Sequence, residues 1–295
     1  MPRLHKVLLF LIIAFFLITR LYKISEIPAS VYWDEASIGY NAYSIVQTGK
    51  DEWGDFLPIH FRAFGEFKLP VYIYSVVPFV KIFGLNEFSV RIPAVLFSLG
   101  AVLLTFLLAR QLTGSNTVGL WSSFFITISP WFFIFSRAGY EATSGLMFYL
   151  LAIFLFLKYP RRGEFIFLSI ISFILSAYSY NSFRIIIPLT LLILIACELK
   201  NLKESFRKNI LGIGLSLSIL VLSIIPIYRL YVYDAGISRL QAVGGDLGLN
   251  LIGNYLSHFS PQFLFLRWDE NLRSQQAGFG QLYLPELIFI IFSLL

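Results

Sequence analysis

The sequence predicts an all-α membrane protein, a bundle of about seven transmembrane helices with part of an eighth. Of its 295 residues, 57% are hydrophobic and only 14% are charged, whereas about a quarter of the residues of a soluble domain are charged. Apolar runs long enough to cross a hydrocarbon core of about 30 Å recur along the chain. The net charge of +6 is distributed as membrane topology requires, so no nucleic-acid partner is expected.

The apolar runs place seven spans, and we treat residues 1–295 as a single transmembrane module. An eighth run begins near Leu287 and stops at Leu295, too short to cross a bilayer. We therefore expect the C-terminal part of the module to be missing from this sequence. The expected spans are residues 5–22, 90–109, 117–135, 142–158, 164–180, 184–199 and 209–228.

The first run follows a basic start and has the length of a signal-peptide core. A cleavage site would need small residues after it, but Thr19, Arg20, Leu21 and Tyr22 stand there. This favours an uncleaved first span over a signal peptide.

Basic residues indicate the orientation. Ten of the 23 lysines and arginines fall in four short segments, residues 1–6, 110–116, 158–164 and 198–208. By the positive-inside rule these segments face the cytoplasm. The sequence therefore predicts a multi-pass plasma-membrane protein with a cytoplasmic N-terminus.

Two long segments then become extracytoplasmic loops, residues 23–89 and 229–286. Within the first loop, Pro70–Gly84 is apolar but too short to span, so we expect a helix lying in the interface against membrane lipids.

Two adjacent carboxylates, Asp34 and Glu35, follow the first span. Apolar spacing predicts a helix from Asp34 to Gln47 that ends at Thr48-Gly49. The carboxylates could do chemistry at the membrane surface. The alternative is structural, with Asp34 as the N-cap and Glu35 as a first-turn acid favoured by the helix dipole.

Three cations are expected on the same side of the membrane. Lys68, among aromatic residues, could snorkel to the headgroups or hold an anionic lipid phosphate. Arg137 and Arg184 stand at the outer ends of spans, where a charge is costly and therefore a functional hypothesis. Alternatively, Arg137 could pair with Glu141, four residues away.

Few other residues suggest chemistry. Tyr40, Tyr180 and His258 are candidate substrate contacts. The three histidines of the sequence do not have the spacing of metal ligands. Asp34 and Glu35 together supply few ligands for a divalent metal, so a metal is possible but we expect that no cofactor is required. The single cysteine, Cys197, excludes an internal disulfide.

Several motifs resemble glycosyltransferase family 39, the dolichyl-phosphate-mannose protein mannosyltransferases and bacterial aminoarabinose transferases with the GT-C fold. Trp33-Asp34-Glu35 looks like the aspartate motif of that family, and Phe67-Lys68-Leu69-Pro70 is similar to its Lys-Pro motif, here with a leucine inserted. Asn86–Ala94 resembles the start of its second span. Later motifs are similar to those of an uncharacterised bacterial branch, in Ser129–Arg137, Tyr178–Arg184, Ser257–Pro261 and Gly280–Leu284.

The resemblance implies an inverting transfer of sugar from a polyprenyl-phosphate donor to a hydroxyl of a protein, lipid or glycan. It implies that Asp34 is the base, with Glu35 in support. It also implies that Lys68 holds the lipid phosphate, with Arg137 and Arg184 as further partners. Independently, the predicted topology puts all five residues on one face of the bilayer.

Two alternatives stay open. A transporter or flippase would explain charges at span ends without a base, but its usual repeated halves are not visible here. A non-catalytic polyprenyl-phosphate-binding protein would share the phosphate site, and only detection of sugar transfer separates it from an enzyme.

Overall fold

The computed structural model describes the chain except residues 65, 160–163, 209, 234–250, 268–279 and 295. The described part is mostly helical, with one short two-stranded sheet. Its elements are α1 (Arg3–Leu21), α2 (Trp33–Thr48), β1 (Phe61–Ala63), β2 (Glu66–Lys68), α3 (Pro70–Phe83), α4 (Glu87–Thr113), α5 (Asn116–Ile128), α6 (Pro130–Phe135), α7 (Glu141–Phe156), α8 (Glu164–Ala177), α9 (Phe183–Lys208), α10 (Ile210–Tyr233), α12 (Leu251–Ser257), the π-helix η1 (Gln262–Leu266) and α13 (Leu284–Leu294).

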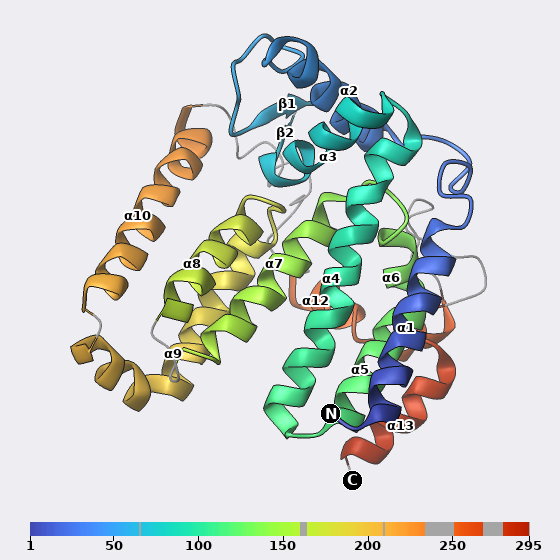
Figure 1. The fold of residues 1–295 in the computed structure, drawn as a ribbon, viewed down its shortest axis with the longest axis vertical. Helices are drawn as coiled ribbons and strands as arrows, with labels where there is room; N and C mark the ends of the chain where they lie inside the picture. Colours follow the sequence, from blue (N-terminus) through green and yellow to red (C-terminus); the bar gives the residue numbers. More distant parts are fainter. Residues whose placement is uncertain (65, 160–163, 209, 234–250, 268–279, 295) are drawn as a thin grey trace.

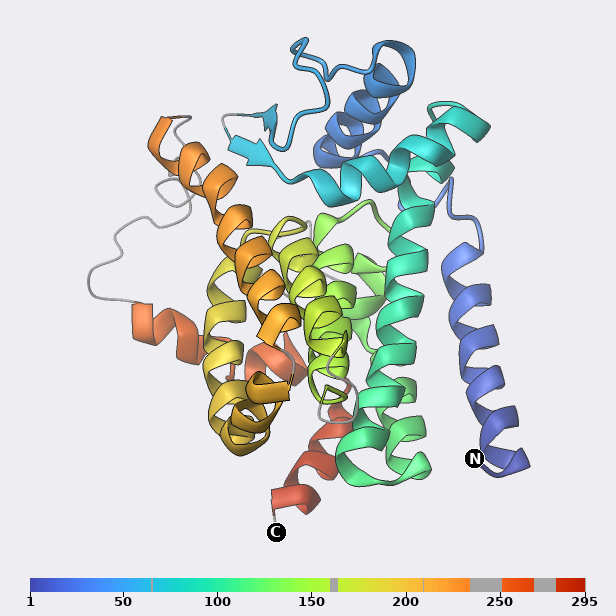
Figure 2. The same ribbon diagram turned by 60° about the vertical axis from the view of Figure 1, so that its left-hand side comes forward.

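The long helices form a bundle with α1 and α10 on opposite sides (Figure 1). Within it, α4 packs against α5 and α7, and α7 packs against α8. The hairpin and helices α2 and α3 cover one end of the bundle in both views (Figures 1 and 2). The first long loop therefore forms a cap over one end of the helices.

Three helices among the described residues are long and apolar enough to cross a membrane: α1, α4 and residues Gly214–Val232 of α10. The other expected spans coincide with shorter or interrupted helices, so the total of seven stays a prediction. The expected span 117–135 is divided into α5 and α6. Ser129 lies between them with ψ at 129°, because a residue before proline is driven out of the helical region.

The expected span 184–199 is the first part of α9, which continues to Lys208 beyond non-helical backbone angles at Glu198. The partial eighth span corresponds to α13. Of the expected second loop, 229–286, residues 234–250 and 268–279 lie outside the described part of the chain.

Both helices expected in the first loop are present. Helix α2 ends at Thr48, and Gly49 follows with φ of 72°, a left-handed conformation that glycine adopts without steric cost. Helix α3 begins at Pro70, in the first-turn position that tolerates proline. The hairpin between them was not predicted, because three-residue strands are too short to show alternation.

A buried apolar cluster fixes the cap to the bundle. It joins Ile38 and Ala42 of α2 to Tyr72 and Val76 of α3 and to the start of α4. Helix α2 approaches α4 so closely that a Cβ added at Gly39 would lie 2.9 Å from Val90. This contact sets the position of the first turn of α2, which carries Asp34 and Glu35.

Candidate active site

Asp34 and Lys68 form an ion pair at the outer edge of the cap. Lys68 Nζ lies 2.5 Å from Asp34 Oδ1, which brings together two residues 34 positions apart. The lysine side chain is only 3% exposed, whereas the aspartate is 26% exposed. Among the described residues Asp34 makes no other polar contact, and its side chain is partly exposed.

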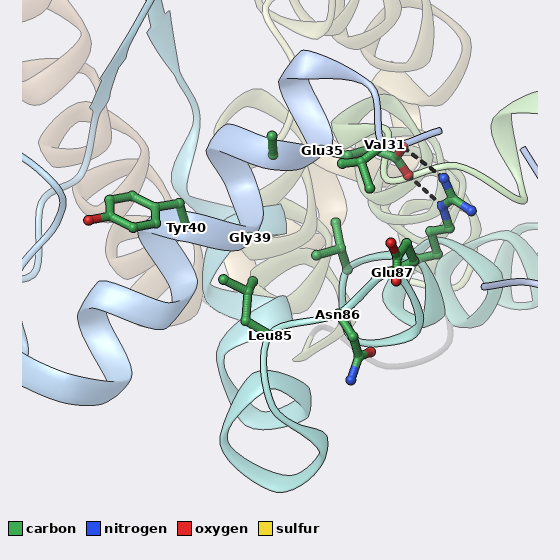
Figure 3. Close-up of a pocket in the computed structure, with 10 residues that line it drawn as sticks. Val31, Glu35, Gly39, Tyr40, Leu85, Asn86 and Glu87 are labelled. Atoms are coloured by element: carbon green, nitrogen blue, oxygen red, sulfur yellow. Dashed lines mark hydrogen bonds and ion pairs between the residues drawn. The ribbon is translucent and has the colours of Figure 1, made fainter. Parts of the chain in front are cut away.

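Glu35 has a different environment although it is the next residue. Arg91 Nε donates to its Oε1 at 2.9 Å and Arg91 Nη2 donates to its Oε2 at 3.2 Å. Figure 3 draws this two-point contact as dashed lines from Glu35. Both side chains are buried, with exposed fractions of 0% for Arg91 and 3% for Glu35.

The structure corrects the capping prediction. Helix α2 begins at Trp33, and Tyr32, not Asp34, is its N-cap. The Tyr32 backbone N–H donates to Glu35 Oε2 at 3.0 Å, the return contact of a capping box. Asp34 thus lies two residues after the N-cap, inside the first turn, and its carboxylate contacts Lys68.

Glu35 also joins segments that are distant in sequence. The backbone N–H of Gly139, between α6 and α7, donates to Glu35 Oε1 at 2.8 Å. A Cβ at Gly139 would lie 3.0 Å from Val90 and 3.2 Å from Glu35, so a side chain there would crowd this contact. Glu35 therefore holds α2, α4 and the α6–α7 connection together.

The α8–α9 connection reaches the same end of the bundle. The backbone N–H of Val71, at the start of α3, donates to the carbonyl of Tyr178 at 3.4 Å. The ring of Tyr178 also lies 6.1 Å from that of His60. Lys68 precedes Val71 by three residues, so the backbone that carries Lys68 approaches the start of the motif that contains Tyr180 and Arg184.

Arg137 is buried, and its guanidinium binds backbone rather than a ligand. Its Nη atoms donate to the carbonyls of Thr19, Tyr22 and Ile27. These contacts tie the end of α1 to the α6–α7 connection. The expected contact of Arg137 with lipid phosphate therefore stays a prediction, and one that this arrangement does not favour.

The remaining candidates are spread over the structure. Arg184 donates to the Ala177 carbonyl at 3.3 Å and to the Tyr231 hydroxyl at 3.4 Å, with Nη2 buried and without a hydrogen bond. His258 packs against Phe263, 5.1 Å between ring centroids. It follows α12, which lies partway down the bundle in both views and not at the capped end (Figures 1 and 2).

A pocket of about 350 Å³ lies beside Glu35, between α2 and the start of α4. Leu85 and Asn86 form its opposite wall in Figure 3, where the ring of Tyr40 points away from them. Near it, the Tyr72 hydroxyl donates to the Val90 carbonyl at 2.9 Å. Burial, with the charge of Glu35 as a second cause, raises the pKa of Tyr72 well above its usual value, so this hydroxyl keeps its proton.

Sequence reasoning assigned no role to two buried arginines. Arg91 lies within the Asn86–Ala94 motif, but no sequence pattern near it indicates that its partner is Glu35. Arg20 is fully buried, donates to Ser136 and to the Thr127 carbonyl, and lies 4.4 Å from the ring centroid of Phe133. The available signal was its position at the outer end of the first span, where a basic residue opposes the positive-inside trend.

No group of three His, Cys, Asp or Glu side chains within the described residues could hold a metal ion. The expectation that no cofactor is required is not tested by this observation.

The fold and the site define a class: a helical membrane protein with an acidic and basic cluster assembled by its first loop at one end. Comparison with known proteins makes this more specific. The sequence profile described as "Dolichyl-phosphate-mannose-protein mannosyltransferase" matches residues 68–228, more than half of the chain. The chain belongs to this family of membrane glycosyltransferases.

An "Uncharacterized protein" of Aquifex aeolicus (strain VF5) is 33% identical over an alignment of 116 residues, and the match covers 35% of this chain. The match covers 23% of that relative's length. The family match begins at Lys68, so Lys68, Arg91, Arg137 and Arg184 fall inside it. Asp34 and Glu35 precede it and are connected to it by their contacts with Lys68 and Arg91.

Proposed function

We propose that this chain carries the acceptor-activating site of an inverting glycosyltransferase that takes sugar from a polyprenyl-phosphate donor at the extracytoplasmic face of the membrane. The observation that supports this best is the 2.5 Å contact between Asp34 and Lys68. It brings a partly exposed carboxylate and a buried ammonium together within the first loop, at the end of the bundle.

Asp34 is the general base in this proposal. Its second carboxylate oxygen accepts a hydrogen bond from the acceptor hydroxyl, which then attacks the anomeric carbon of the donor sugar. The new glycosidic bond forms as the bond between that carbon and the phosphate oxygen breaks. The hydroxyl proton passes to Asp34, and the electron pair of the broken bond stays on the lipid phosphate.

Lys68 stabilises the negative charge that develops on the leaving phosphate. Its ammonium has three donors, so one can stay on Asp34 while another contacts a phosphate oxygen. Because Lys68 is 3% exposed, donor binding must displace a neighbouring side chain before the phosphate reaches it. Arg184, with one buried donor unused, is a second cation for the same phosphate.

Glu35 has a positioning role. Arg91, Gly139 and Tyr32 already donate four hydrogen bonds to its two oxygens. A carboxylate engaged in this way has no oxygen left for a substrate, so it fixes the helix that presents Asp34.

The decisive experiment uses the full-length protein in lipid nanodiscs with a panel of polyprenyl-phosphate sugars. Release of polyprenyl phosphate and glycosylation of the acceptor are both measured. The Asp34→Asn substitution should lower transfer by roughly 10²- to 10⁴-fold, the usual contribution of a general base, while binding of the donor is retained. Asp55→Asn, in the same loop and exposed, is the matched control and should leave transfer unchanged.

Unchanged transfer in Asp34→Asn would refute the assignment of the base. Donor binding without any transfer by the unmodified protein would instead favour a non-catalytic lipid-phosphate-binding protein.

The proposed orientation has its own test. Cys197 is the single cysteine, so Asp55→Cys in a Cys197→Ala background places one thiol in the first loop. A membrane-impermeant maleimide should label this variant in intact cells. Labelling only after the cells are lysed would place the site on the cytoplasmic side.

A further inference from the structure

A second pocket lies between α2, which carries Asp34, and the hairpin, which carries Lys68. It has a volume of about 340 Å³ and is enclosed by α2, by residues 52–53 and by the β1 side of the hairpin. The residues that determine its chemistry are Ser37, Tyr40, Glu52, Trp53, Arg62 and Phe64.

The lining combines exposed aromatic rings with hydrogen-bonding groups. Tyr40, Trp53 and Phe64 are 53%, 63% and 64% exposed, an unusual exposure for three large rings around one hollow. Glu52 and Arg62 add an acceptor and a fork of donors, and the Ser37 hydroxyl is buried without a hydrogen bond. Aromatic faces that pack on C–H groups, beside polar groups that bind hydroxyls, suit the two faces of a pyranose ring.

Hydrogen bonds hold the pocket in shape without a ligand. Asn41, fully buried beneath it, donates to Glu52 Oε1 at 2.8 Å and accepts from the Glu52 backbone N–H at 3.2 Å. Trp53 Nε1 donates to the Arg62 carbonyl at 3.2 Å, which links the two walls. Asp51 Oδ1 accepts from the backbone N–H groups of Trp53 and Asp55, both at 2.9 Å. A site organised in advance loses less entropy when it binds.

Residues that line or support the pocket share a face of α2 with Asp34. Asp34, Ser37 and Asn41 are spaced three and four residues apart, so they share one face of α2. Ser37 is three residues after Asp34, a rise of about 4.5 Å along the helix. In addition, the ring of Phe64 stacks on Trp33 with centroids 5.5 Å apart and planes 24° apart.

From these observations we propose that the pocket binds a pyranose of the acceptor, so that the acceptor is a glycan. This inference rests on the proposed function, because the pocket is assigned to the acceptor by its place on the helix face that carries Asp34. Protein hydroxyls would not require three exposed rings around a cavity the size of one or two sugar units.

The test measures sugar binding directly, with the full-length protein in nanodiscs. The probes are the methyl glycosides of glucose, galactose, mannose and N-acetylglucosamine, and binding is followed by saturation-transfer NMR. At least one probe should bind, and Trp53→Ala should weaken its binding about tenfold, equivalent to about 1.4 kcal/mol. Trp53→Phe, which keeps an aromatic face, should restore most of the affinity.

Trp121→Ala is the matched control, because Trp121 is 54% exposed but belongs to α5, away from the cap. Its sugar binding should equal that of the unmodified protein. Absence of binding by all four probes, or equal loss in the Trp53 and Trp121 variants, would overturn the proposal. Binding of a serine- or threonine-containing peptide that Trp53→Ala abolishes would also overturn it, in favour of a protein acceptor.

Asp34→Asn separates this inference from the proposed function. If both are right, that variant still binds the glycoside but no longer transfers sugar. Retained transfer together with normal sugar binding would refute the base and leave the pocket intact.

Discussion

The two faces of the first turn of α2 place neighbouring carboxylates in opposite environments. On one face, Asp34 is partly exposed and has Lys68 as its one partner among the described residues. On the other, Glu35 is buried, accepts four hydrogen bonds and holds three segments of the chain together. Adjacent residues of the same charge thus have different partners and different burial, because one helical step of about 100° separates the directions of their side chains.

The two ion pairs should also contribute differently to the stability of the fold. A buried ion pair is costly to break from one side, because the remaining charge is left without a partner in a low dielectric. In the other pair Asp34 is 26% exposed although Lys68 is only 3% exposed, and an isostere of Asp34 that still accepts a hydrogen bond leaves the ammonium partly satisfied, so this substitution costs less. Substitutions on the two faces should therefore separate loss of fold from loss of activity.

The largest effect on stability is expected on the buried face. Arg91→Met removes both donors of the guanidinium and leaves Glu35 as an uncompensated buried charge. We expect a loss of about 3–5 kcal/mol in the free energy of unfolding, measured by equilibrium denaturation in detergent micelles. Arg110→Met, on the same helix α4 but exposed, should change it by less than about 0.5 kcal/mol.

A smaller loss should follow from crowding the same face. Gly139→Ala adds a methyl group 3.0 Å from Val90 and 3.2 Å from Glu35, which forces the neighbouring side chains to shift. We expect a cost of about 1–3 kcal/mol, typical of overpacking, in the same denaturation assay. The control is Gly214→Ala in α10, where an added Cβ has no neighbour within 4 Å. Equal stability of the two variants would show that the Gly139 contact is not tightly packed.

The smallest effect on stability is expected for a substitution of Asp34. Asp34→Asn keeps an oxygen that accepts a hydrogen bond from the buried Lys68 ammonium and removes only the counter-charge, so the loss in the free energy of unfolding should be about 1 kcal/mol. Together with the expected loss of transfer, this would sharpen the division between the two carboxylates. A loss as large as that of Arg91→Met would show that Asp34 is structural as well.

Much of this cap could be predicted from sequence, because its signals are local. The apolar spacing of α2, Gly49 at its end and Pro70 at the start of α3 each act within a few residues. The expectation that Asp34 and Lys68 share a site came from topology and from the family resemblance, and the contact at 2.5 Å agrees with it. Their catalytic roles stay predictions.

What could not be predicted depends on contacts between distant segments. The pairing of Arg91 with Glu35 spans 56 residues, and only the packing of α2 on α4 creates it. The local pattern offered Asp34 as the N-cap of this helix as the structural alternative. That alternative is wrong, because Tyr32 is the N-cap. Likewise, the carbonyl partners of Arg137 lie at least 110 residues away in sequence, so no local pattern indicated them, and its contact with lipid phosphate stays a prediction.

The contact between Glu35 and Gly139 has a consequence for biogenesis. The two residues are 104 positions apart, which a ribosome covers in roughly 5–20 s at about 5–20 residues per second. Arg91 is synthesised earlier, 56 residues after Glu35. The ion pair can therefore form before Gly139, which donates the last hydrogen bond to Glu35, has been synthesised. Assembly of this carboxylate's environment therefore has two stages, and the first turn of α2 reaches its final anchoring only after the α6–α7 connection has been synthesised.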